Sequence, residues 1–146
     1  MIISLPDVNI WIALAAEGHV HHLPARAWFA RQADGSVAFC RITQMGLLRL
    51  LTNPRVMGRA PRTIGQAWET FEQLRADRRL VFASEPERIE SAWRGFMTQP
   101  AVGPSSWTDA YLAAFAEAHS YSLVTFDTGF ARWPALELQL LSLALE

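Results

Sequence analysis

Three of the five aspartates in the chain stand at the borders of predicted helices and strands. Asp7 directly follows the apolar run at 2–5 and its closing proline, and Asp127 follows a second apolar run. Asp109 lies near the start of the helix that leads into this second run. In open parallel sheets, ligands bind beyond the carboxyl ends of the strands, where the strand order reverses. We therefore predict that these three carboxylates converge on one point.

Each aspartate also has a purely structural interpretation. Asp7 suits the N-cap of a helix, Asp109 complements a helix dipole, and Asp127 before Thr-Gly suits a turn. Together, however, three carboxylates at one point repel each other unless a cation neutralises them. Oxygen ligands without a nearby Cys or His pair favour Mg²⁺ or Mn²⁺. A metal held in this way polarises a phosphate and activates a water molecule for attack on it.

The elements that must position these residues alternate between strands and helices. The connections are too long for hairpins, which predicts a parallel α/β sheet with helices on both faces, in one domain spanning 1–146. The last apolar run is also compatible with a helix. The segment 53–62 is predicted to be a loop. We expect strands at 2–5, 37–40, 80–83, 138–143 and just before Asp127, and helices at 8–16, 19–33, 43–51, 63–76, 86–97 and around Asp109.

Composition excludes several other classes of protein. The net charge is −1, and all 13 basic side chains are arginines. The absence of lysine disfavours a P-loop nucleotide site, and it also disfavours the receiver domains and dehalogenase-type phosphatases that pair a lysine with an aspartate. A single cysteine, Cys40, excludes an internal disulfide. No apolar run approaches the roughly 18–20 residues of a membrane span, and no signal peptide is apparent, so we expect a cytoplasmic protein.

Histidines and tryptophans offer further candidates. His19, His21 and His22 lack a Cys or another His at zinc-ligand spacing, so a surface or capping role is favoured over zinc. Trp11 and Trp28 are predicted to lie in the core, with a protein interface as the alternative. In the helix at 63–76, the apolar side chains expected to face inward are Ile64, Ala67, Trp68, Phe71 and Leu74.

Five segments together resemble a known family. They are PDVNIWIALA at 6–15, HVHHLPARAWF at 19–29, CRITQMGLLRLLTNP at 40–54, TDAYLAAFA at 108–116 and LVTFDTGF at 123–130. In this order they resemble PIN-domain proteins, and more narrowly the VapC-type toxins of bacterial toxin–antitoxin pairs. The resemblance implies a three-layer α/β/α sandwich with a small, mostly parallel sheet of four to five strands. It also implies a Mg²⁺ or Mn²⁺ site, cleavage of structured RNA such as tRNA or rRNA, a homodimer, and inhibition by a VapB-type antitoxin.

The resemblance assigns the acidic positions of the family. Asp7 matches the first acid, Asp109 the third and Asp127 the fourth. The second acid directly follows the threonine of the CxxT segment, where this chain has Gln44. An amide can ligate a metal or hold a metal-bound water, but it brings no charge. Asn9 matches the DxN pattern of the family and is expected to orient the Asp7 carboxylate or a metal-bound water, with a plain polar residue of the first helical turn as the alternative. Thr43 and Thr125 are candidates to hydrogen-bond the same carboxylates, although Thr125 also suits a strand through its β-propensity alone.

Arginines around the predicted loop at 53–62 are the candidates for contacts with RNA phosphates. Arginine pairs with phosphate through two hydrogen bonds, although a solvated loop is the competing interpretation. These candidates are Arg49, Arg55, Arg59 and Arg62. Because Gln44 removes one acid, a catalytically weak module that binds RNA or an antitoxin is an alternative to the nuclease. A phosphatase acting on small molecules through the same carboxylates is a second alternative.

Overall fold

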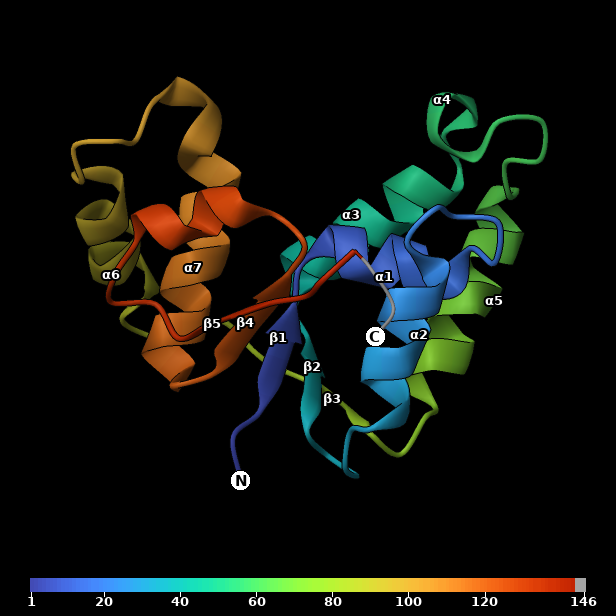
Figure 1. Cartoon of the computed structure of the whole chain (residues 1–146), viewed down its shortest axis with the longest axis horizontal. Helices are drawn as coiled ribbons and strands as arrows, with labels where there is room; N and C mark the ends of the chain where they lie inside the picture. The colour runs from blue at the N-terminus through green and yellow to red at the C-terminus, as the bar shows by residue number, and fades with distance from the viewer. Residues whose placement is uncertain (144–146) are drawn as a thin grey trace.

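The computed structural model describes residues 1–143 and contains a parallel sheet between two layers of helices (Figure 1). The five strands have the order β3-β2-β1-β4-β5, and every neighbouring pair is parallel. This is the predicted α/β sandwich, with five strands. The strands are β1 (Ser4–Pro6), β2 (Val37–Phe39), β3 (Leu80–Phe82), β4 (Ser122–Thr125) and β5 (Leu138–Leu140).

Helices cover both faces of this sheet. The pair α6 and α7 covers one face, whereas α1, α2, α3 and α5 cover the other (Figure 1). The short α4 follows α3, and 3₁₀ turns precede α7 and follow β4. The bounds are α1 (Val8–Ala15), α2 (His22–Ala30), α3 (Arg41–Leu51), α4 (Pro54–Met57), α5 (Ile64–Arg75), α6 (Ile89–Met97), η1 (Pro104–Ser106), α7 (Trp107–His119) and η2 (Thr128–Arg132).

The strand order reverses between β1 and β4. The chain leaves β1 toward β2 and β3, and later returns on the other side of β1 to form β4 and β5. Pro6 lies opposite Val124 in this central pair, and the Asp7 N–H donates to the Val124 carbonyl at 2.9 Å. Because parallel strands end at the same edge, the residues after β1 and β4 meet at this reversal, as the sequence predicts for Asp7 and Asp127.

Large apolar side chains fill the space between the sheet and each helical layer. On the side of α1, Trp11 stacks on Phe39 with ring centroids 3.7 Å apart, and Trp28 is also buried. Both tryptophans thus lie in the core, which confirms the favoured prediction. Gly46 allows α3 to approach α1 closely, because a Cβ at this position would lie 2.8 Å from the Val8 side chain. This close approach brings α3 to the edge of the sheet where Asp7 lies.

Several predicted boundaries are wrong. The helix expected at 19–33 is shorter at both ends, and the one expected at 86–97 begins only at Ile89. By contrast, α3 begins two residues before the predicted start, because the Thr43 hydroxyl and the Cys40 backbone cap its first turn. The segment expected to be a loop contains α4. The last apolar run forms β5, so the helical alternative is wrong for the described part of that run.

The inward face of α5 is narrower than predicted. Ala67 and Phe71 are buried, but Ile64 is 73% exposed and Trp68 is 47% exposed. These two side chains lie at the border between α5 and α3, where they line a shallow cavity of about 180 Å³ with Leu48. At the N-terminal end of α5, Ala67 is therefore the buried member of the predicted inward stripe.

In the described chain, 1–143, no helix combines the length and apolarity needed to cross a bilayer.

Candidate active site

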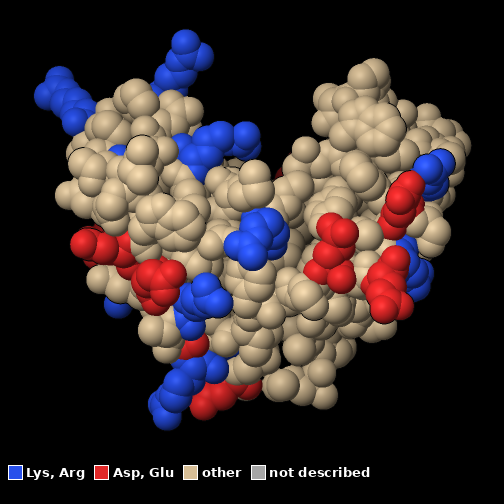
Figure 2. Space-filling model, turned by 180° about the vertical axis from the view of Figure 1, so that it is seen from behind, with Lys and Arg blue, Asp and Glu red and all other residues tan. Residues whose placement is uncertain are grey.

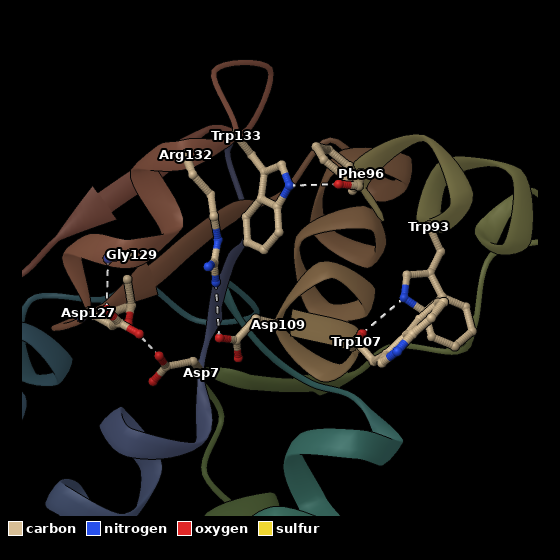
Figure 3. Close-up of polar contacts among 10 residues, drawn as sticks. Asp7, Trp93, Phe96, Trp107, Asp109, Asp127, Gly129, Arg132 and Trp133 are labelled. Atoms are coloured by element: carbon tan, nitrogen blue, oxygen red, sulfur yellow. Dashed lines mark hydrogen bonds and ion pairs between the residues drawn. The ribbon is translucent and has the colours of Figure 1, made fainter. Parts of the chain in front are cut away.

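A cavity of about 110 Å³ opens at the carboxyl ends of β1 and β4. Asp7, Asp109 and Asp127 all line it, and Figure 3 shows their side chains gathered beside the N-terminal end of α7. The structure therefore brings the three predicted carboxylates to one place. The other lining residues are Val8, Asn9, Ile42, Thr43, Gly46, Arg49, Thr108, Leu112 and Phe130.

Asp7 is the most enclosed of the three carboxylates, with only 4% of its surface exposed. It caps α1, and its Oδ1 accepts hydrogen bonds from the backbone N–H groups of Asn9 at 2.9 Å and Ile10 at 3.2 Å. The Thr125 hydroxyl donates to its Oδ2. Burial raises the pKa of Asp7 to about 6, although these hydrogen bonds oppose the shift, and the charge of Asp109 adds slightly to it.

Asp109 and Asp127 complete the carboxylate group from two different segments. Asp109 lies in the first turn of α7, and burial raises its pKa, while Arg132 opposes this shift and Asp127 adds to it. The Arg132 guanidinium lies 3.5 Å from Asp109 Oδ2 (Figure 3). Asp127 caps the turn after β4, where its Oδ1 accepts from the Gly129 N–H at 2.8 Å. Asp109 is thus partly neutralised by a residue of the chain.

Thr125 connects two of the aspartates. Its side chain is fully buried, its hydroxyl donates to the Asp7 carboxylate, and its Oγ1 accepts from the Asp127 N–H at 3.0 Å. The predicted contact of Thr125 with a carboxylate is therefore present. Thr43 differs, because its hydroxyl bonds to the backbone of Cys40 and contacts none of the aspartates. Asn9 contacts Asp7 through its backbone N–H.

Gln44 is held by a neighbouring arginine. Its side chain is buried, and its Oε1 accepts a hydrogen bond from Arg41 Nη1 at 2.6 Å. It is not among the residues that line the cavity. Gln44 therefore does not line the cavity with the three aspartates, although Thr43 and Gly46 on the same helix do. No sequence pattern indicated that Arg41, three residues earlier, would hold this amide.

The four candidate arginines occupy different environments. Arg49 lines the cavity itself, and Arg55 and Arg59 are exposed on and after α4. Arg62 is half-buried, and its Nη2 donates to the Ala15 carbonyl at 3.1 Å, which ties it to the end of α1. Figure 2 shows a deep notch between two lobes, with basic side chains on the lobe that carries α4.

Arg132 was not predicted from the sequence as a site residue, because it contacts Asp109 across 23 residues of sequence.

The donor set of this cavity suits a hard divalent cation. Its acidic groups are carboxylates, and no ion pair within residues 1–143 involves Asp7, so a cation would relieve the cost of burying its charge. As they stand, however, no three Asp, Glu, His or Cys side chains in the described residues lie close enough to form a ready metal site. The histidines are engaged elsewhere: His22 contacts the Ala13 carbonyl, and His19 accepts from the His21 N–H.

Comparison with known proteins identifies the family. The family model of the PIN domain matches residues 4–136. The chain belongs to the PIN-domain family. It is 46% identical over 143 residues to Ribonuclease VapC41 of Mycobacterium tuberculosis, covering 94% of this chain and 98% of that protein. It is also 34% identical to Ribonuclease VapC44 of the same organism, with 88% of each chain covered. Within the PIN-domain family, the chain is therefore a VapC-type ribonuclease.

Solved structures support the same fold. VapBC2 from Rickettsia felis, bound to a DNA fragment from its promoter, aligns with a TM-score of 0.69 at 16% identity, covering 97% of this chain and 100% of that chain. VapC20 of Mycobacterium tuberculosis, described as a toxin that cleaves the sarcin-ricin loop, aligns with a TM-score of 0.67 at 19% identity, covering 88% and 92%. The parallel sheet and its helical layers are thus those of PIN-fold VapC proteins.

Proposed function

We propose that this PIN-domain protein is a Mg²⁺- or Mn²⁺-dependent endoribonuclease that cleaves structured RNA as the toxin of a type II toxin–antitoxin pair. The observation that carries this proposal is the convergence of Asp7, Asp109 and Asp127 on one small cavity at the strand-order reversal. The 46% identity to a named VapC ribonuclease supports RNA as the substrate class. The chain then acts where RNA is made and used, in the cytoplasm.

The three aspartates would hold the cation, which when bound supplies Lewis-acid activation of a phosphate and of a water molecule. Thr125 orients Asp7, because its hydroxyl donates to one carboxylate oxygen while the backbone of α1 holds the other. Arg132 offsets the charge of Asp109. Arg49, which lines the cavity, is placed to pair with the phosphate that is cleaved, and Arg55 and Arg59 with the neighbouring RNA backbone.

Two protein partners belong to this proposal. A VapB-type antitoxin would cover the cavity, and the structural similarity to VapBC2 of Rickettsia felis and VapBC-1 of nontypeable Haemophilus influenzae supports such a partner. A second copy of the chain would pack on the α3–α5 border, where Ile64 and Trp68 expose large apolar side chains. Replacing both Ile64 and Trp68 with serine should shift the protein from dimer to monomer in size-exclusion chromatography with light scattering. An unchanged mass would exclude this face as the dimer interface.

The experiment that tests the activity is cleavage of total bacterial RNA by purified protein freed of antitoxin, with Mg²⁺, Mn²⁺ or EDTA. Discrete fragments should form with either metal and vanish with EDTA. Asp7→Asn should abolish them, whereas the matched exposed variant Asp34→Asn should retain them. Intact RNA under every condition, from protein shown to be folded, would contradict the nuclease and favour a module that only binds RNA or antitoxin.

A further inference from the structure

A second and larger cavity lies on the other side of α7. It has a volume of about 410 Å³ and lies between α6, the first turns of α7 and the segment before α6. In Figure 3, Trp107 and Asp109 project to opposite sides of the start of α7, so this cavity is separate from the carboxylate site. Its lining residues are Glu85, Ile89, Glu90, Trp93, Arg94, Trp107 and Tyr111.

Three aromatic side chains form its walls. The ring of Trp93 lies 5.8 Å from that of Trp107 at an angle of 83°, and 5.4 Å from that of Tyr111 at 85°. The Trp93 indole N–H donates to the Trp107 carbonyl at 3.0 Å, which fixes the orientation of this ring. Trp107 is 56% exposed, although it is one of the largest apolar side chains of the chain. The walls are therefore held in place and remain open to solvent.

Acidic side chains accompany these aromatic walls. Glu85 accepts a hydrogen bond from the Tyr111 hydroxyl through Oε2 at 2.5 Å, which places its carboxylate directly beside a ring of the cavity. Glu90 pairs with Arg94 at 2.8 Å, and both side chains are more than 70% exposed. The charged lining residues thus sum to −1. An RNA phosphate would be repelled here, whereas a cation would be attracted both by the carboxylate and by the ring faces.

We propose that this aromatic cavity binds the guanidinium group of an arginine on a basic segment of a partner protein. A planar guanidinium can stack on an indole and still pair with a carboxylate, which a lysine ammonium cannot do as well. The chain already uses this combination elsewhere. Arg79 lies 3.9 Å from the ring centroid of Phe29 while it pairs with Asp77. The proposal does not depend on the nuclease activity.

The test is an NMR titration of the full chain with two short peptides that differ only in arginine or the neutral isostere citrulline. The arginine peptide should shift the indole N–H signals of Trp93 and Trp107 and bind roughly tenfold more tightly than the citrulline peptide. Trp107→Ala and Glu85→Gln should each weaken binding by roughly fivefold. Glu137→Gln, which removes an exposed carboxylate just before β5, should leave binding unchanged.

Glu85→Gln keeps the proposal testable if Trp107→Ala does not fold, since it changes one exposed carboxylate. Equal binding of the arginine and citrulline peptides would overturn the proposal. It would also be overturned if a single-stranded RNA oligonucleotide shifted the same indole signals more strongly than the arginine peptide, because the rings would then stack on bases. Glu85→Gln should cleave RNA as the wild type does, which separates this cavity from the carboxylate site.

Discussion

Asp7 and Asp77 show two opposite ways of placing a carboxylate in one fold. Asp77, in the turn before β3, accepts hydrogen bonds from the side chain of Arg79 at 2.9 and 2.8 Å, and these bonds lower its pKa to about 2. Asp7 is buried beside another aspartate, and burial raises its pKa to about 6. The first carboxylate stabilises its turn, whereas the second costs stability whenever it is ionised without a cation.

The difference indicates which carboxylate serves the fold and which serves the site. The cation that Asp77 needs is supplied two residues later by its own chain, so its charge is already balanced. Asp7 has hydrogen bonds from backbone N–H groups and Thr125, but within residues 1–143 it has no ion-pair partner. A buried carboxylate group of this kind is typical of functional sites, where an incoming ligand provides the balancing charge.

The largest expected effect is on the stability of Asp7→Asn without metal. Because the folded pKa of Asp7 is raised, its contribution to stability is full below pH 3.8 and is lost as the pH rises through about 6. At pH 7.5 this loss is about 3 kcal/mol, so Asp7→Asn should melt roughly 6–12 °C higher than the wild type. Asparagine preserves the N-cap of α1.

Melting curves between pH 4 and pH 8, with EDTA present, measure this effect. The increase in melting temperature caused by Asp7→Asn should shrink toward zero near pH 4, where the wild-type carboxyl is protonated. Asp34→Asn, an exposed aspartate in a turn, serves as the control and should show no such trend. A variant that is less stable than the wild type at every pH would contradict the assignment of Asp7 as a buried, unbalanced carboxylate.

Adding a divalent cation should restore part of the stability that the wild type loses when Asp7 is ionised. A ligand present at ten times its dissociation constant stabilises the folded state by about 1.4 kcal/mol, which corresponds to roughly 3–6 °C at this chain length. Mg²⁺ or Mn²⁺ should therefore raise the melting temperature of the wild type and of Asp34→Asn. Asp7→Asn and Asp109→Asn should respond much less. An equal response of all four proteins would point to binding outside the carboxylate cavity.

Asp77→Asn should lower the stability of the folded protein, whereas Asp7→Asn should raise it. The folded pKa of Asp77 is lowered, so its contribution is present above pH 3.8 and is lost as the pH falls through about 2. After allowance for the solvent around this pair, the variant should lose about 1 kcal/mol at pH 7. Thermal unfolding at pH 7 and pH 2 checks this, and RNA cleavage should be unaffected. A stabilised Asp77→Asn would remove the contrast between the two aspartates.

The sequence predicts the carboxylate cavity well because its determinants are local. An aspartate after an apolar run places a carboxyl group at the end of a strand, and the alternation of elements makes the strands parallel. Asp7 and Asp127 therefore meet without any knowledge of the packing. Asp109 follows the same logic, since it lies in the first turn of the helix before β4.

Contacts between helices and between distant side chains could not be predicted in this way. Periodicity places Ile64 and Trp68 on the same stripe as Phe71, but how much of that stripe α3 covers depends on the approach of two helices. The pairing of Arg132 with Asp109 depends on where η2 lies relative to α7. Even within one helix, the direction of the Gln44 side chain is decided by Arg41, which no motif marks.

Gln44→Glu is expected to have the smallest effect and bears most directly on the missing acid. The Gln44 side chain is held by Arg41 and lies outside the lining of the cavity, so a glutamate should form an ion pair with Arg41 and leave the metal-dependent activity within about threefold of wild type. RNA cleavage at several Mg²⁺ concentrations measures this, with Gln32→Glu, two residues after α2, as the matched control. Arg41→Ala combined with Gln44→Glu would free the new carboxylate. A tenfold gain in Mg²⁺ sensitivity in the double variant alone would mean that Arg41 keeps residue 44 out of the carboxylate cavity. The same gain in the single variant Gln44→Glu would mean that the side chain of residue 44 already reaches that cavity.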